Sequence, residues 1–286
     1  MKKFILSAVL LSMAYAFSAD IIWRKYKEII TDVTISSTDN LIIEAGTTVR
    51  FAPGASLTVY GQITANGTET DPVILAALDR VSTEWDGIVI NSMSGNNVFN
   101  YTSFNFMTAP VGSENGGLSI FQSNASFNYC KFINCHGEAG GAMKITGGNV
   151  TVQNTYFTLN GSPNGGAIHI YNDSNMPSLI NINSCRFQNN DGWSNGGAIY
   201  ILDTPASPSF MDLNITRCLM FDNHSGLGGA VFYQNEGKIN AEFSKCRILR
   251  NTSDWGSAIY ARFQPFVPGS IPLQKFANLL VYKNAG

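Results

Sequence analysis

The sequence has few charged residues and no excess of positive charge. Charged residues make up 13% of the 286 positions, and 18 Lys and Arg stand against 20 Asp and Glu. A soluble domain usually has about a quarter of its residues charged. Without a basic excess the chain lacks the attraction that draws proteins to phosphate backbones, so we expect no nucleic-acid partner. The mild acidity also disfavours anionic surfaces as partners.

Helical periodicity is also missing. Apart from the first 19 residues and the segment Asp20 to Ile30, no window of a dozen residues spaces apolar side chains at helical intervals. We expect Asp20 to Ile30 to form a short amphipathic cap that buries Ile21, Ile22 and Tyr26. Because 44% of the residues are hydrophobic, the chain can still bury a large core, and we do not expect disorder.

The first 19 residues have the organisation of a signal peptide. Two lysines precede an apolar stretch from Phe4 to Tyr15, which is too short for a bilayer span. An A-x-A cleavage pattern ends at Ala16, with Ser18 and Ala19 as alternative ends. Cleavage after Ala16 leaves 16 basic against 20 acidic residues, a net charge of −4. We therefore expect an exported protein with no membrane span once the signal is removed.

Two glycines followed by Ala and an apolar residue recur along the chain. Strict copies begin at positions 140, 165, 196 and 228, and Gly256 to Ile259 keeps most of the pattern. Looser copies begin at 85 and 115, so the successive spacings are 30, 25, 25, 31, 32 and 28 residues. A repeat of this period is typical of a solenoid in which each unit is one coil.

A second landmark, Phe-x-x-Asn, lies inside each unit. Phe157 to Asn160 and Phe187 to Asn190 are strict copies, and three later units keep an apolar residue and the Asn. Two further positions recur in register with it, as stacked residues in a narrow solenoid should. The position two residues before the Phe, or before its apolar substitute, holds Thr102, Cys130, Thr155, Cys185, Cys218 and Cys246. The position three residues earlier holds Phe99, Phe127, Val152, Ile182, Ile215 and Phe243.

The segments between these landmarks predict short strands. Ala167 to Ile170 and Ala198 to Ile201 are rich in β-branched residues, and Asn149 to Val152 alternates with period two. Three strands per unit, separated by Gly and Asn corners, describe one triangular coil, and coils stack about 4.8 Å apart. We predict an all-β right-handed parallel β-helix of about ten coils. We expect it to be one domain over residues 20–286, behind a signal peptide at 1–19.

The last predicted landmark falls close to the end of the chain. Asn284 predicts another Gly pair about five residues later, beyond Gly286. Solenoids need a capping end that protects the last strands. We therefore expect the C-terminus to be uncapped and the chain to be truncated.

The cysteines predict core packing. Four of the five occupy the position two residues before the Phe, which holds Thr in other coils, and Cys135 replaces a turn Asn. Export would favour disulfides or metal ligation. However, no C-x-x-C pair exists, and side chains that point inward from stacked parallel strands behave as small buried hydrophobes. We therefore predict five buried thiols, with no metal and no cofactor.

The acidic residues and histidines predict no catalytic site. No two acids of the repeat region share a strand position in adjacent coils, so we expect solvated surface charges. They are Glu138, Asp173, Asp191, Asp203, Asp212, Asp222, Glu236, Glu242 and Asp254. His136, His169 and His224 are expected at the surface, without the partners that a triad or a metal site requires.

Loops of variable length are the best functional lead. They lie between the first and second strands of a coil, at 171–178, 202–211 and 262–272, and insertions on one side of a solenoid commonly build its binding face. Two tryptophans occupy a different corner, where they offer stacking platforms for sugars or partner proteins or simply pack onto the turn. The candidate binding residues are Tyr171, Asp173, Trp193, Trp255, Phe263 and Phe266.

The paired motifs carry a resemblance. GGAI with Phe-x-x-Asn over residues 85–286 resembles the repeats of the chlamydial polymorphic outer membrane proteins and of bacterial β-helices of the pectin-lyase-like superfamily. Residues 55–90 are similar to the opening coils of other exported bacterial β-helices. The resemblance implies an adhesin that is extracellular or associated with the outer membrane at a bacterial cell surface. Its partners would be a host or environmental surface and a glycan or protein ligand.

Three functions follow as hypotheses. The first is a secreted or surface-displayed, non-enzymatic β-helix that acts in adhesion or in extracellular ligand binding, with carbohydrate as one ligand class. The second is a polysaccharide lyase or glycoside hydrolase, which would need acids clustered on adjacent coils. The third is a structural stalk that carries a separate downstream module.

Overall fold

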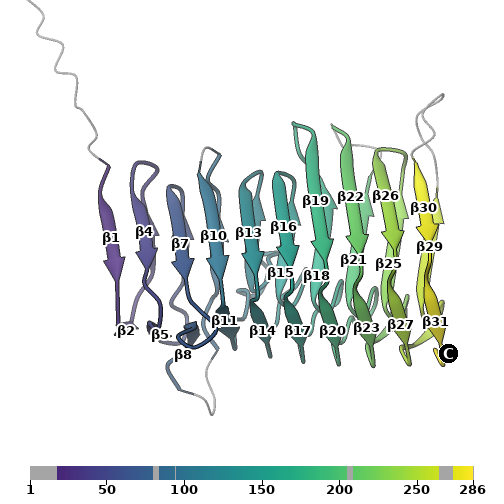
Figure 1. Ribbon diagram of the computed structural model, residues 1–286, viewed down its shortest axis with the longest axis horizontal. Helices are drawn as coiled ribbons and strands as arrows, with labels where there is room; N and C mark the ends of the chain where they lie inside the picture. The colour runs from purple at the N-terminus through teal and green to yellow at the C-terminus, as the bar shows by residue number, and fades with distance from the viewer. Residues whose placement is uncertain (1–17, 80–83, 94, 205–208, 264–272, 286) are drawn as a thin grey trace, which may run out of the picture.

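The computed structural model describes residues 18–79, 84–93, 95–204, 209–263 and 273–285. These residues form 31 strands and no helix. Three parallel sheets run the length of the molecule, and successive coils stack along it (Figure 1). The described residues contain no helix of the length and hydrophobicity that a membrane span requires. The chain is therefore the all-β parallel β-helix that the repeats predict.

Each coil contributes strands to the three sheets in turn. Sheet A holds β1 (Asp20–Trp23), β4 (Asn40–Ile43), β7 (Gln62–Asn66), β10 (Asn96–Asn100), β13 (Asn124–Asn128), β16 (Asn149–Gln153), β19 (Ser178–Asn183), β22 (Met211–Thr216), β26 (Ile239–Ser244) and β30 (Gln274–Ala277). Sheet B holds β2 (Tyr26–Ile29), β5 (Thr48–Phe51), β8 (Val73–Ala77), β11 (Thr102–Asn105), β14 (Lys131–Ile133), β17 (Tyr156–Thr158), β20 (Arg186–Gln188), β23 (Leu219–Phe221), β27 (Arg247–Leu249) and β31 (Leu280–Tyr282). Sheet C holds β3 (Val33–Ile35), β6 (Leu57–Val59), β9 (Ile88–Ile90), β12 (Leu118–Phe121), β15 (Met143–Thr146), β18 (Ile168–Asn172), β21 (Ile199–Asp203), β25 (Val231–Asn235) and β29 (Ile259–Phe263). A short pair, β24 (His224–Leu227) and β28 (Thr252–Trp255), lies at the corner between sheets B and C.

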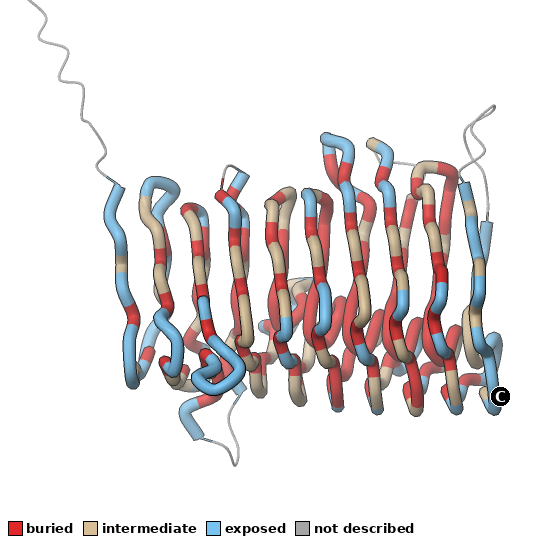
Figure 2. The backbone as a smooth tube through the Cα atoms, viewed as in Figure 1, coloured by how far each residue is buried: buried red, intermediate tan, exposed pale blue. Residues whose placement is uncertain are grey.

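The core consists of ladders of like residues, because alternate side chains point inward and each coil repeats the last in register. The Phe of Phe-x-x-Asn stacks from coil to coil: the rings of Phe104 and Phe132 lie 4.4 Å apart, and those of Phe157 and Phe187 4.8 Å apart. The second apolar ladder is also in register, from Phe99 to Phe243. Buried and exposed positions alternate along most strands (Figure 2). The predicted ladders are confirmed.

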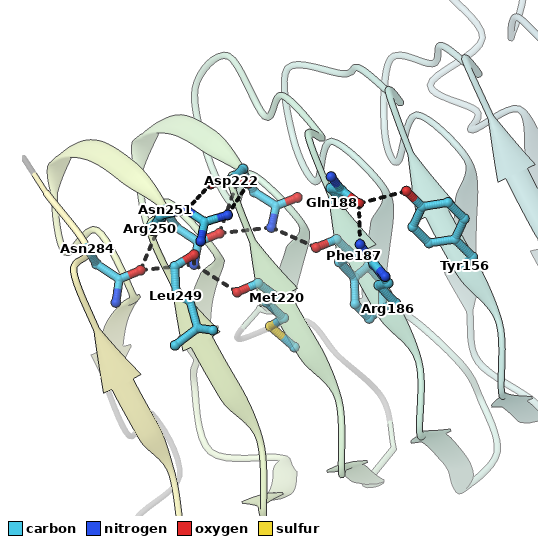
Figure 3. Close-up of polar contacts among 11 residues, drawn as sticks. Tyr156, Arg186, Phe187, Gln188, Met220, Asp222, Leu249, Arg250, Asn251 and Asn284 are labelled. Atoms are coloured by element: carbon cyan, nitrogen blue, oxygen red, sulfur yellow. Dashed lines mark hydrogen bonds and ion pairs between the residues drawn. The ribbon is translucent and has the colours of Figure 1, made fainter.

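The Asn of Phe-x-x-Asn forms a buried ladder of amides that runs along the solenoid. The side-chain nitrogen of Asn223 donates to Asn251 Oδ1 at 2.8 Å, and that of Asn190 donates to Asn223 Oδ1 at 2.9 Å. Each amide also bonds backbone groups of neighbouring coils, and Asn284 continues the series (Figure 3). Because these side chains are buried, the ladder satisfies polar backbone groups that water cannot reach.

The glycine pair is required by close packing at the start of each sheet C strand. Gly165 has φ 75°, and a Cβ there would lie 2.2 Å from the Ile168 carbonyl oxygen. A Cβ on Gly166 would lie 2.3 Å from the carbonyl oxygen of Gly197, in the next coil. The first glycine therefore allows a left-handed turn, and the second allows neighbouring turns to touch.

Two other corners place non-glycine residues in the left-handed region. The corner between sheets A and B does so at Tyr101, Tyr129, Asn154, Ser184, Arg217, Lys245 and Asn278. The corner after sheet B does so at Phe106, Asn134, Leu159, Asn189, Asp222, Arg250 and Lys283. A side chain other than Gly or Asn costs about 1 kcal/mol or more in this conformation. These corners hold their shape because the stacked coils impose it.

The five thiols are buried and unpaired, as predicted. Burial raises the pKa of the Cys130 thiol to about 12 and that of Cys135 to about 12. Cys135 occupies the position of the ladder Asn, where its backbone N–H donates to Asn160 Oδ1 at 3.0 Å. These cysteines pack as small apolar side chains.

The expected cap at Asp20 to Ile30 is wrong. The segment forms strands β1 and β2, which pair with β4 and β5 as the first coil of sheets A and B. Trp23 and Ile29 are the buried side chains, whereas Ile22 is 44% exposed and Tyr26 58% exposed. Strand alternation, not a helical stripe, decides which residues face inward here.

Core-facing side chains are exposed in the last described coil. Phe276 stacks on Phe243 and Val281 pairs with Ile248, so both occupy core ladders. They are nevertheless 43% and 50% exposed. Among the described strands, β30 and β31 are the last of sheets A and B, and each pairs on one side.

Candidate functional site

A groove lies on the outer face of sheet C, across β12, β15 and β18. Its volume is about 510 Å³. Side chains from consecutive strand ends form its floor, and loops at 91–93 and 113–115 form its walls. The lining residues are Asn91, Met93, Ser113, Glu114, Asn115, Phe121, Gln122, Lys144, Thr146, Tyr171 and Asp173. Two of the predicted binding residues, Tyr171 and Asp173, thus lie in one hollow.

One wall of the groove is fastened by charged side chains. The Glu138 carboxylate accepts the backbone N–H groups of Gly112 at 2.6 Å and of Glu114 at 3.2 Å. Lys144 Nζ donates to the Glu114 carbonyl oxygen at 2.7 Å. Charge-assisted hydrogen bonds of this kind are stronger than neutral ones. The loop wall is therefore held in place before any ligand binds.

Lys144 is the most perturbed charged group in the groove. It lies on the outer face of β15 yet is only 8% exposed. Burial lowers its pKa, while the nearby carboxylates of Glu114 and Asp173 act in the opposite direction. A lysine that combines a lowered pKa with a position in a groove is a candidate for binding or proton transfer.

His169 is buried, which overturns the expectation that it lies at the surface. It pairs with Lys144 in register, and its ring centroid lies 4.7 Å from that of Tyr200 on the next strand. Only 6% of the residue is exposed, and neither ring nitrogen has a hydrogen-bond partner among the described residues. Burial, followed by the charge of Lys144, lowers its pKa to about 3. The stacking of long side chains on the outer face causes this burial.

The other histidines are paired with carboxylates. His136 Nδ1 lies 3.1 Å from Glu84 Oε1, and His224 Nδ1 lies 3.3 Å from Asp191 Oδ1. His136 and His224 belong to one ladder, three coils apart, with Gly161 and Asp191 between them. Among the described residues, no three His, Cys, Asp or Glu side chains are grouped closely enough to hold a metal ion.

Two acids that were expected to be solvated are buried. Asp203 is fully buried, and its carboxylate accepts the backbone N–H groups of Glu236 at 3.2 Å and of Lys238 at 2.9 Å. Asn172 donates to the same carboxylate from the preceding coil at 3.0 Å. Glu236 is 7% exposed. Asp203 therefore fastens a turn between sheets C and A, a structural role that the linear sequence did not reveal.

The remaining candidates do not join the groove. Trp193 and Trp255 are 55% and 68% exposed and lie at the corner between sheets B and C, and Trp193 packs near Gly161. Phe263 is 46% exposed and meets the ring of Tyr233 edge-on at 5.5 Å. Phe266, with most of the 262–272 loop, lies outside the described residues.

A second hollow, which we call the tyrosine hollow, lies beside the corner between sheets A and B. Its volume is about 420 Å³, and its walls include Tyr101, Tyr129, Lys131 and Tyr156. The Tyr101 and Tyr129 rings stack at 4.8 Å with an angle of 8° between their planes. Sequence reasoning missed this site and Lys144. The coil alignment already held the signal, because it places Tyr101 above Tyr129 and Lys144 above His169.

The sequence and the structure were compared with known proteins. No protein-family model matches the chain. No curated protein and no solved structure matches it either.

Proposed function

We propose that this chain is an exported, non-enzymatic β-helix that binds a ligand in the groove of sheet C, in adhesion or ligand capture at a cell surface. The observation that carries the proposal is the gathering of Tyr171 and Asp173 with Lys144 in one preformed groove. These residues come from consecutive coils and from the loop that sequence reasoning selected. A rigid scaffold that presents side chains from variable loops is a common basis for recognition.

The chemistry of the lining favours a carbohydrate. Phe121 and Tyr171 supply aromatic rings to the lining. The side chains of Gln122 and Thr146 can both donate and accept hydrogen bonds, and the Asp173 carboxylate accepts them. Sugar rings combine an apolar face with a rim of hydroxyls, so they match such a mixed surface. Lys144 and Asp173 carry opposite charges, which suits a neutral or amino sugar in the groove.

One observation favours an enzyme as the second candidate. The buried Lys144 has a lowered pKa, so it can act as a base toward a proton next to a carboxylate of a polysaccharide. In that case the chain would be a lyase, and Tyr171 would be the neighbouring group that orients the substrate. Among the described residues, the carboxylates that line the groove are those of Glu114 and Asp173, and both act on Lys144.

The test is calorimetry on a panel of neutral and amino-sugar oligosaccharides chosen by array screening. We expect Tyr171→Ala and Asp173→Asn each to weaken binding about tenfold, as removal of a central contact usually does. Trp193→Ala is the matched control, because this exposed aromatic residue lies on another corner, and it should change affinity less than twofold. Equal losses in the control and in the groove variants would refute the groove as the site.

The same preparation decides between binding and cleavage. Incubation with uronate polysaccharides should release no unsaturated products, which absorb in the ultraviolet. Release of such products by the native chain, and its loss in Lys144→Met, would replace the binding proposal with the lyase.

A further inference from the structure

Positive charge is concentrated on one face of the solenoid, although the chain as a whole is slightly acidic. Between positions 120 and 286 the chain has eleven Lys and Arg. Seven of them are exposed on the outer face of sheet B or at the left-handed residue of each flanking corner, and we call this surface the basic face. They are Lys131, Arg186, Arg217, Lys245, Arg247, Arg250 and Lys283.

Acidic residues are nearly absent from the basic face. Of the nine acids in the same part of the sequence, Asp222 lies on it, at the corner after β23, where it pairs with Arg250 at 2.6 Å. Asp191 and Asp254 lie beyond it, at the start of the turn that leads to sheet C. Glu242 lies on the adjoining face of sheet A, where it pairs with Lys275 at 3.2 Å. Glu69 lines the tyrosine hollow together with Lys131. Among the described residues, Arg250 is thus the cation of this face that forms an ion pair within it, while Lys245 is attracted to Glu242 on the adjoining face.

Four of the cations occupy corner positions with a left-handed backbone. Arg217, Lys245, Arg250 and Lys283 all have positive φ, between 51° and 56°, which favours Gly and Asn. The same corners hold Asn154, Asn189 or other residues in other coils. The corner residue points away from the core, so in these coils it places a positive charge at the edge of sheet B.

Two of the cations, Arg186 and Arg250, are held by polar contacts with neighbouring side chains (Figure 3). The Arg186 guanidinium lies 4.6 Å from the Phe221 ring centroid and 5.3 Å from that of Tyr156, and it donates to Gln188 at 2.8 Å. The Arg250 guanidinium lies 5.7 Å from the same Phe221 ring centroid. Stacking on aromatic rings limits the conformational freedom that these side chains would lose on binding.

We propose that the basic face binds a linear anionic polysaccharide, bearing sulfate or carboxylate groups, that lies along the solenoid axis. Cations recur on successive coils, and one strand spacing is close to the length of one sugar unit, so repeated charges on the polymer can meet repeated charges on the protein. The tyrosine hollow continues the same face and offers ring edges and hydroxyls to the sugar. This site does not depend on the groove of sheet C.

The aromatic residues favour a polysaccharide over a single-stranded nucleic acid. Base stacking needs a free aromatic face. Here the Tyr101 and Tyr129 rings stack on each other, and Arg186 covers faces of Tyr156 and Phe221. Hydroxyl groups and ring edges are what remain for a ligand, and they suit sugar hydroxyls better than bases.

The experiment measures affinity for four polymers of similar length: a sulfated dextran, a polyuronate, unmodified dextran and single-stranded DNA. The site variant combines Arg217→Gln, Lys245→Gln and Arg247→Gln. The charge-matched control combines Lys238→Gln, Arg262→Gln and Lys275→Gln, which are cations of sheets A and C and of the turn between them. Circular dichroism and melting temperature should be unchanged in both, because none of the six side chains is buried.

We expect the native chain to bind sulfated dextran or polyuronate, with affinity that falls steeply as salt rises, and to ignore unmodified dextran. The site variant should lose about 100-fold in affinity at low salt and show a shallower salt dependence, whereas the control loses less than threefold. Tyr171→Ala should leave this binding unchanged, which separates it from the groove. Equal losses in both triple variants, no binding to either anionic polysaccharide, or tighter binding to DNA would each overturn the proposal.

Discussion

The buried amide ladder allows a sharp test of what holds the coils together. Asn223 makes four hydrogen bonds through its side chain: it donates to Asn251 Oδ1 at 2.8 Å and to the Phe187 carbonyl at 3.1 Å. It also accepts from the backbone N–H of Asn190 at 3.0 Å and from its side-chain nitrogen at 2.9 Å. Replacing Asn223 with Ala removes all four and leaves the Asn190 backbone N–H buried without that partner.

The expected loss follows from these bonds. Each hydrogen bond contributes about 1 kcal/mol net, and an orphaned buried donor costs about 1–3 kcal/mol. Because part of the ladder keeps other partners, we expect Asn223→Ala to lower the free energy of unfolding by about 3 kcal/mol. In a chain of this size that corresponds to a melting temperature about 6 to 12 °C lower. The amide of Asn190 should also exchange its hydrogen faster.

Two further variants separate hydrogen bonding from packing. Asn223→Asp keeps the shape of the side chain but replaces the donor with oxygen, which then faces the Asn251 Oδ1 and Phe187 carbonyl oxygens. It should destabilise the chain at least as much as Ala at neutral pH. Asn149→Ala removes an exposed amide from sheet A and should cost less than about 0.5 kcal/mol. Urea denaturation measures all three, and a loss below about 1 kcal/mol in Asn223→Asp would refute this account of the ladder.

Three other predictions address the corners and the buried groups. Leu159 has φ 58° and is 53% exposed, so Leu159→Asn should raise the free energy of unfolding by about 1 kcal/mol. A lower melting temperature for this variant would contradict the strain at that corner. The five buried thiols should not react with a thiol reagent at pH 8 until the chain is unfolded, because the reagent cannot reach them and burial also raises the pKa of Cys130 and of Cys135 to about 12. Rapid labelling of any one of them in the native chain would contradict this packing. Burial holds the pKa of His169 at about 3, below its unfolded value of 6.5, so the stability that depends on neutral His169 is present above pH 6.5 and is lost as the pH falls toward 3. Relative to the native chain, His169→Phe should therefore gain about 2 to 3 kcal/mol in urea denaturation between pH 7.5 and pH 4.5, and a difference that does not change with pH would refute the buried neutral state.

The sequence by itself determined the coil and its core. The Gly pair, the Phe ladder and the turn Asn recur at coil spacing, because a solenoid brings equivalent positions into contact and a close contact accepts few residue types. The inward direction of the cysteines followed from the same register. Strand alternation at Trp23 and Ile29 was the exception, since a single opening coil has no repeat to reveal its period.

Only the tertiary structure decided what the outer faces look like. Coil alignment places Lys144 above His169, but how far their side chains are buried, and that of Asp203, depends on the size of neighbouring side chains and on turns that fold over them. For the same reason, the sequence did not predict the basic face. Its cations come from different coils and are separated in the sequence by acids that lie on other faces. The net charge near zero therefore gave no sign of a surface that forms only when the coils stack.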